Sequence, residues 1–220
     1  MGKYRVGAFS AFSGKVGNLI GSHWRDISYL RARPEHVSNP NTPAQQTQRG
    51  KFALIMRFLK QVKPVLGLGF EGEGIGRLPF QNAVSYNLKH ATSGTAPDVR
   101  IDYPAVLVTR GPLNPAEDAA MVSEQPGELA VSWTSQLMFG NASPDDEAVI
   151  LLYNTSRDMA LYITEGGPAR SEESWPLSLP ATYRGDTLEG YLSFVSPDRE
   201  QVSYSRYLGS VTVMEEGPGT

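Results

Sequence analysis

Residues 128–135, ELAVSWTS, alternate apolar and polar side chains. This period of two is typical of a β-strand with one buried face. Comparable runs stand at 102–110 (DYPAVLVTR), 147–154 (EAVILLYN), 159–165 (MALYITE), 187–196 (TLEGYLSFVS) and 202–213 (VSYSRYLGSVTV). Turn-forming stretches such as NASPDD and EGGP separate these runs. Their number and spacing predict an antiparallel β-sandwich or barrel.

The C-terminal half resembles a fibronectin type III or immunoglobulin-like domain. Trp133 in LAVSW corresponds to the core tryptophan of the second strand, and Tyr153 in VILLYN to the aromatic residue of the third. Leu177 or Leu179 takes the place of the leucine before the tyrosine strand, and Tyr191 in GYLSF is that tyrosine. The resemblance implies a two-sheet sandwich.

The N-terminal part begins with short β-forming runs. Residues 18–24 (NLIGSHW) and 27–33 (ISYLRAR) predict a β-hairpin. In the second run, Tyr29, Arg31 and Arg33 alternate with other residues, which places them on one face of the strand.

A helix is expected after this hairpin. Thr42 and Gln45 have the spacing of a capping box, so the helix should begin there and end near Lys63. Gly50 makes this helix about 1 kcal/mol less stable than alanine would at the same position, which indicates a close packing contact there. A shorter helix is expected at 79–90. The fold class is therefore mainly β (α+β overall): an N-terminal β-hairpin plus one or two helices, then a fibronectin/Ig-like antiparallel β-sandwich.

The charge distribution divides the chain at a similar place. Residues 1–70 hold 11 Lys and Arg against two acidic residues, a net charge of +9, and no lysine follows Lys89. Residues 96–220 hold 7 Arg against 19 Asp and Glu, a net charge of −12. We therefore predict a basic β-hairpin/helical domain at 1–95 and an acidic fibronectin type III-like sandwich at 100–214.

The N-terminal half is similar to a large bacterial family of unknown function with SGKVGN, NP-T-AQ and QR-KF elements. Here SGKVGN occupies residues 13–18, and the arginines that follow it in the family pattern are Arg31 and Arg33. NP-T-AQ corresponds to Asn39, Pro40, Thr42, Ala44 and Gln45, and QR-KF to Gln48, Arg49, Lys51 and Phe52. The NP-T-AQ stretch is also similar to a module in phage virion-associated proteins. Neither resemblance implies an activity, and the second favours a role in assembly.

Several chemical functions lack the residues that they need. The glycine-rich run at 67–76 lacks the Gly-Lys-Ser/Thr of a phosphate loop, and Glu71 and Glu73 would repel a phosphate. The chain has no cysteine, which excludes disulfides, thiolate nucleophiles and Cys-based zinc sites.

The other candidate metal ligands are also poorly placed. His23, His36 and His90 are scattered and have no metal-ligand spacing. We interpret the acidic run at 145–147 as a solvated turn rather than a calcium loop. The sequence thus predicts a protein without catalytic residues, metal or cofactor.

The basic N-terminal domain is the candidate functional surface. The candidate interface or nucleic-acid contact residues are Lys15, Arg25, Arg31, Arg33, Arg49, Lys51, Arg57, Lys60 and Lys63. Three interpretations remain open: contact with the acidic surface of another copy, binding of a nucleic acid, or a solvated face without a partner. We expect a non-enzymatic structural or assembly protein, virion-like or surface-assembled, with self-association or a larger assembly as its partner and the sandwich as a spacer or recognition domain. A nucleic-acid-binding protein is the alternative.

No apolar run reaches the roughly 18 residues of a membrane span, and the N-terminus lacks the apolar core of a signal peptide. A cytoplasmic protein is expected, or a virion or extracellular protein that arrives by another route.

Overall fold

The computed structural model describes residues 12–24, 27–36, 39–70, 78–135, 137 and 140–215, and the backbone of residues 2–4. The chain forms two compact units, Met1–Asn41 and Thr42–Thr220. This division differs from the boundary expected between residues 95 and 100. The helices of residues 43–90 group with the sandwich because both contribute to one buried apolar cluster.

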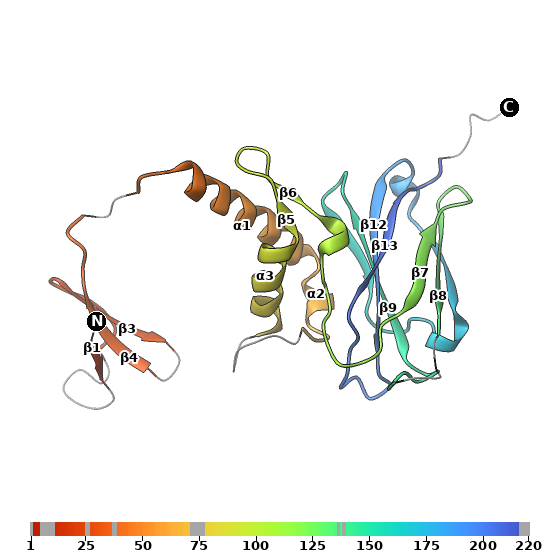
Figure 1. The fold of residues 1–220 in the computed structure, drawn as a ribbon, viewed down its shortest axis with the longest axis horizontal. Helices are drawn as coiled ribbons and strands as arrows, with labels where there is room; N and C mark the ends of the chain where they lie inside the picture. Colours follow the sequence, from red (N-terminus) through yellow and green to blue (C-terminus); the bar gives the residue numbers. More distant parts are fainter. Residues whose placement is uncertain are drawn as a thin grey trace. The chain divides into compact units, whose positions relative to one another are not determined.

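The first unit is a small antiparallel sheet (Figure 1). Its strands, in the order β1-β4-β3-β2, are β1 (Gly2–Tyr4), β2 (Gly14–Val16), β3 (Leu19–Trp24) and β4 (Ile27–Ala32). The expected hairpin is formed by β3 and β4, whose pairing runs from Leu19 opposite Ala32 to Trp24 opposite Ile27. Gly17, with φ of 54°, supplies the left-handed backbone of the turn between β2 and β3.

The second unit contains the sandwich, whose two antiparallel sheets have the orders β11-β8-β7 and β10-β9-β12-β13. Its strands are β7 (Glu117–Val122), β8 (Glu128–Thr134), β9 (Glu147–Asn154), β10 (Met159–Ile163), β11 (Ser174–Ser178), β12 (Thr187–Val195) and β13 (Arg206–Thr212). The predicted fold class, mainly β with an antiparallel sandwich, is confirmed.

Two details of the strand prediction were wrong. Residues 102–110 do not form a sandwich strand, because Tyr103–Ala105 make a 3-10 turn that opens with Pro104 near its first position. The first strand of the sandwich is instead β7, whose sequence EDAAMV has few β-forming residues and so gave little local signal.

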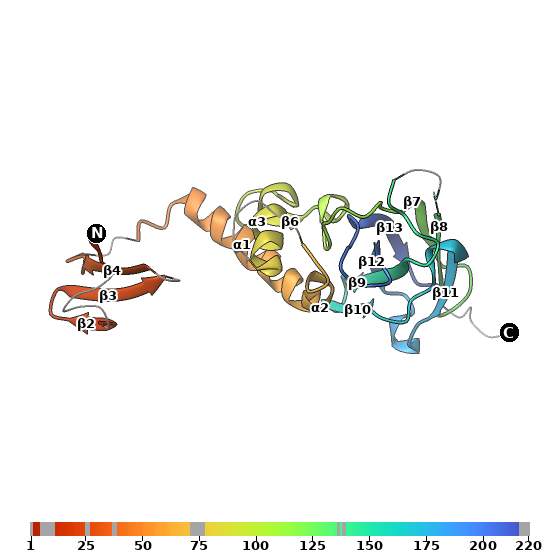
Figure 2. The ribbon, with the colours of Figure 1, turned by 90° about the horizontal axis from the view of Figure 1, so that it is seen from below.

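Three helices cover one face of the second sheet (Figures 1 and 2). They are α1 (Pro43–Gln61), α2 (Lys63–Leu66) and α3 (Pro79–His90), and a short hairpin of β5 (Thr92–Ser93) and β6 (Arg100–Ile101) follows them. The capping box is confirmed, with the Gln45 amide donating to Thr42 Oγ1 at 3.3 Å. A Cβ at Gly50 would lie 3.2 Å from Val99 Cγ2, which is the close contact expected there.

The sheet of order β10-β9-β12-β13 packs against apolar residues on both of its faces. In β9, Ile150 and Leu152 point into the sandwich core, whereas Leu151 and Tyr153 join the cluster beneath the helices. Tyr191 of β12 also faces the helices, and its hydroxyl donates to the Tyr103 carbonyl at 2.9 Å. The second unit therefore has three layers, and two of the fibronectin-like aromatic positions lie between the sheet and the helices.

The acidic run at 145–147 does not form the fully solvated turn that we expected. Asp146 is 1% exposed and its Oδ2 accepts from Nε of Arg170, itself 0% exposed, at 2.9 Å. The Arg170 guanidinium also donates to the Asn114 carbonyl at 2.7 Å and lies 3.8 Å from the centre of the Phe194 ring. A buried carboxylate needs such a partner, and only the fold supplies it.

Candidate interface on the N-terminal sheet

Strand register divides the side chains of the N-terminal sheet between two faces. Lys15 of β2, Ile20 of β3 and Arg31 of β4 lie opposite one another across three strands. Directly opposed residues share a face, and residues two apart along a strand return to it. Among the side chains that the structure describes, the set on this side, which we call the open face, is Lys15, Ile20, Ser22, Trp24, Ile27, Tyr29 and Arg31.

The chain itself covers part of the opposite face. Gly21 is buried, and a Cβ built there would come within 2.3 Å of Cδ1 and 2.6 Å of the carbonyl oxygen of Phe12. Phe12 therefore packs directly against the glycine backbone, and a larger residue would displace it. On the same side, the Ser28 hydroxyl and His23 Nδ1 are 2.8 Å apart.

No side chain of the open face is buried. Trp24 is 60% exposed and Ile27 is 39% exposed. Among the described residues of the first unit, only Gly21 is buried. None of these residues belongs to the sandwich core or to the apolar cluster beneath the helices. A small sheet that buries few apolar side chains gains little stability from its own core, so the open face is suited to contact with another surface.

The structure distributes the predicted cationic residues between the two units. Lys15 and Arg31 lie on the open face, and Arg33 is exposed directly after β4. Arg25 lies outside the described residues. The remaining candidates belong to the second unit: Arg49, Lys51, Arg57 and Lys60 on α1, and Lys63 at the start of α2.

Arg57 already has a partner within its own unit. Its Nε donates to Oδ2 of Asp158, while the Tyr153 hydroxyl donates to Oδ1 of the same carboxylate. Burial raises the pKa of Tyr153, and the hydrogen bond to Asp158 raises it further, so this tyrosine remains a neutral donor. A cavity of about 170 Å³ adjoins the three side chains and is also lined by Phe58 and Tyr103.

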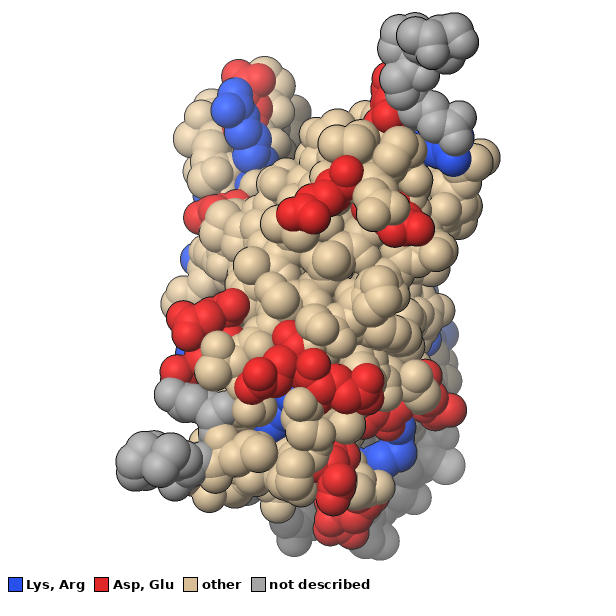
Figure 3. Space-filling view, turned by 90° about the vertical axis from the view of Figure 1, so that its right-hand side faces the viewer, with Lys and Arg blue, Asp and Glu red and all other residues tan. Residues whose placement is uncertain are grey.

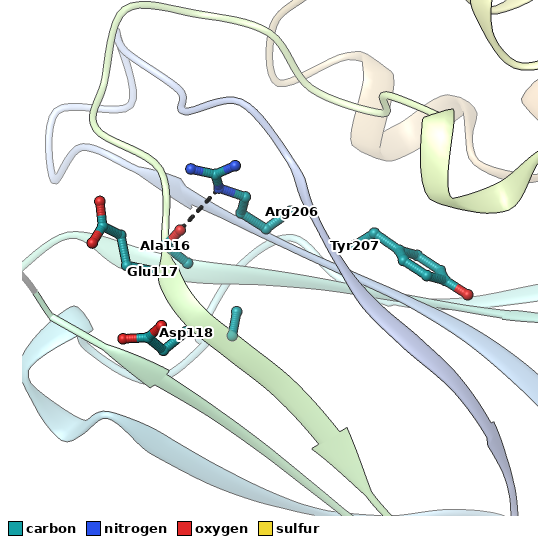
Figure 4. A pocket seen from close by; sticks show the side chains of 6 residues that line it. Ala116, Glu117, Asp118, Arg206 and Tyr207 are labelled. Atoms are coloured by element: carbon teal, nitrogen blue, oxygen red, sulfur yellow. Dashed lines mark hydrogen bonds between the residues drawn. The ribbon is translucent and has the colours of Figure 1, made fainter.

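A larger cavity, of about 400 Å³, lies between β7 and β13 (Figure 4). Arg206 crosses it, donating from Nε to the Ala116 carbonyl at 3.0 Å, and Tyr207 donates to Glu189 Oε2 at 2.6 Å. Asp118 at its rim has a left-handed backbone with φ of 45°. Its described lining residues are Ala116, Glu117, Asp118, Ala119, Arg206 and Tyr207.

The three histidines belong to different segments: His23 to β3, His36 to the stretch after β4 and His90 to the end of α3. Within the described part of the chain, no three His, Asp or Glu residues gather as metal ligands would. None of the described helices is both long enough and apolar enough to span a membrane.

Sequence reasoning placed Tyr29 and Arg31 on one face and named Trp24 as a stacking residue beside the cations, but it did not include Ile20 or Ile27 in the candidate site. The register of the β3–β4 hairpin was the signal that could have found them, because opposed residues share a face.

Two solved domains are similar in structure to about half of this chain. The fibronectin type III domain of human collagen alpha-1(XX) has 17% identity and a TM-score of 0.36, and the alignment covers 49% of this chain and 91% of that domain. The corresponding domain of human contactin 1 has 12% identity and a TM-score of 0.31, covering 51% of this chain and 87% of that one. No curated protein matches the sequence. Residues 11–209 match the family of unknown function DUF6266, and since that match spans both units, the chain belongs to this family.

Proposed function

We propose that this protein is a non-enzymatic structural or assembly component whose open face binds the acidic sandwich of a second copy. The supporting observation is that an N-terminal sheet without buried apolar side chains among its described residues presents Trp24, Ile27 and Tyr29 together with Lys15 and Arg31. Aromatic and arginine residues are the types that most often dominate protein interfaces.

Charge supports a second copy as the partner. Residues 1–41 hold six Lys and Arg against two acidic residues, whereas residues 96–220 have a net charge of −12. Figure 3 shows Asp and Glu side chains gathered above and below an uncharged area on one side of the molecule. Opposite potentials steer and orient association, and a head-to-tail contact of this kind closes into a ring or extends as a filament.

We place this assembly in a virion-like or surface-attached structure, with the sandwich as a spacer or recognition domain. The support is the expectation from sequence pattern alone that residues 39–52 resemble a module of phage virion-associated proteins. Adjacent capsid or tail genes would be the simplest independent sign of such a setting.

The test is the mass of the full chain in solution over a range of protein and salt concentrations. We expect self-association that weakens as salt screens the charges, and that falls at least about tenfold in Trp24→Ala, as for a hot-spot aromatic residue. Phe52→Ala is the matched control, because Phe52 is an aromatic residue on α1 that is 48% exposed. A strictly monomeric protein at high concentration and low salt would overturn the proposal.

A nucleic acid is the second candidate partner. The observation that favours it is the pairing of Lys15 and Arg31 with the rings of Tyr29 and Trp24 on one face, since bases stack on aromatic residues beside cations. Titration with duplex and single-stranded DNA tests it. Steep salt dependence and loss of binding when Arg31, Arg33 and Arg49 are neutralised would support it, and salt-independent or absent binding would refute it.

A further inference from the structure

The described strands of the sandwich leave four edges, β10 and β13 in one sheet and β7 and β11 in the other. An edge strand presents unpaired N–H and C=O groups that can pair with another strand. Proteins commonly protect such edges with proline, charged residues, bulges or a covering segment. The four edges of this unit differ in this protection.

Three of the edges carry protective features. β7 contains a bulge and the acidic, left-handed residue Asp118. β11 has Pro176 at its centre, where the ring removes a backbone donor. β13 is interrupted by a bulge in its pairing with β12 and begins with Arg206.

β10, at the edge of the four-stranded sheet (Figure 2), has none of these features. Its sequence, MALYI, contains no charge and no proline. Its register with β9 is unbroken from Met159 opposite Asn154 to Ile163 opposite Ile150. Among the described residues, the backbone of 159–163 makes no hydrogen bond besides this ladder. Met159 is 52% exposed and Tyr162 is 38% exposed.

We propose that β10 pairs antiparallel with β10 of a second copy about a two-fold axis, which joins two four-stranded sheets into one continuous sheet. The strand is suited to its own copy. Centred on Leu161, the pairing sets Ala160 opposite the second copy's Tyr162, and Met159 opposite its Ile163. A small residue then faces a large one on the helix-covered face of the sheet, where Ala160 packs against the cluster beneath the helices, and no like charges oppose each other within the strand.

The residues that flank β10 favour the same pairing. The turn before the strand carries Arg157, which pairs with Asp186 and has a side chain 46% exposed. The segment after the strand carries Glu165, which lies 3.9 Å from Arg199 and has a side chain 81% exposed. Antiparallel pairing brings the Arg157 end of one copy beside the Glu165 end of the other. The two-fold axis repeats this approach of opposite charges at both ends, which a strand of unrelated sequence would not provide.

This interface lies on the second unit and is distinct from the open face. The two interfaces in one chain would combine a two-fold contact with a head-to-tail contact, and such a combination extends an assembly beyond a dimer. The inference does not depend on the open face, since β10 pairing alone gives a closed dimer.

The first experiment measures dimer dissociation of the full chain with Tyr162→Lys. Two lysines then enter the shared edge, so we expect the dissociation constant to rise at least about tenfold, with the circular dichroism spectrum unchanged. Val122→Lys is the matched control, because Val122 is an apolar strand residue of the other sheet and is 46% exposed. Equal effects of the two substitutions, or no effect of Tyr162→Lys, would overturn the proposal.

A cross-link then tests the register directly. The chain has no cysteine, so the double variant Ala160→Cys/Tyr162→Cys introduces the only thiols. Directly opposed strand residues have Cα atoms about 4.5–5.5 Å apart, within the range of a disulfide. We expect a covalent dimer on mild oxidation. The control Ala120→Cys/Val122→Cys has the same spacing on β7 and should remain monomeric under denaturing conditions. Equal cross-linking of both variants would contradict β10 pairing.

The outcomes separate this inference from the proposed function. If Trp24→Ala abolishes all self-association and the β10 variants have no effect, the open face is an interface and the β10 inference is wrong. If Tyr162→Lys abolishes it and Trp24→Ala has no effect, β10 pairing stands and the proposed role of the open face fails.

Discussion

Removal of one partner of the buried ion pair should strongly destabilise the second unit. Asp146→Ala leaves the Arg170 guanidinium, 0% exposed, without its carboxylate, while its Nη1 already has no hydrogen-bond partner among the described residues. Burial lowers the pKa of Arg170 and Asp146 opposes that shift, so loss of Asp146 removes the group that stabilises the charge. We expect a loss of about 3–5 kcal/mol in the free energy of unfolding, as for other broken buried pairs.

Urea unfolding of the full chain, followed by circular dichroism, measures this loss. For a unit of this size, each kcal/mol lowers the melting temperature by about 2–4 °C. The double variant Asp146→Leu/Arg170→Met removes both charges together, and we expect it to be more stable than either single variant. Arg199→Met is the control, because Arg199 pairs with Glu147 with its side chain 35% exposed and should cost about 1 kcal/mol or less. Additive losses in the double variant would refute the reasoning.

Three further outcomes follow from the described contacts. Gly21→Ala should disrupt the first unit, because its Cβ would meet Phe12 at 2.3 Å, and amide NMR signals of that unit should shift while those of the sandwich do not. Burial raises the pKa of Tyr191, so its contribution to stability is complete below about pH 10 and is lost as pH rises through the folded value. The part of the tyrosinate absorbance that Tyr191→Phe removes should therefore appear together with unfolding. Hydrogen bonds from Arg157 and Asn154 lower the pKa of Asp186. Its contribution to the free energy of unfolding is therefore present above about pH 4 and is lost as the pH falls. Asp186→Asn should flatten the acid side of the curve of stability against pH, measured by urea unfolding.

Local sequence patterns determined much of the fold. The capping residues Thr42 and Gln45 fixed the start of α1, and the alternation in ELAVSWTS identified β8 with Trp133 in the core. These features depend on residues close together in the chain, so a short window of sequence contains them. The opposite net charges of the two halves likewise follow from the sequence alone.

Tertiary structure decided which surfaces meet. Asp146 and Arg170 become one buried pair although the sequence shows only an acidic run and a distant arginine. The helices join the sandwich because Val149, Leu151 and Tyr153 complete a cluster with α1, a pairing that no local pattern records. The open face and the bare β10 edge likewise appear only once strand order and register are known. The sequence by itself determined periodicity, caps and charge, because these are local; packing partners and free edges arise from contacts between distant segments, which only the folded chain brings together.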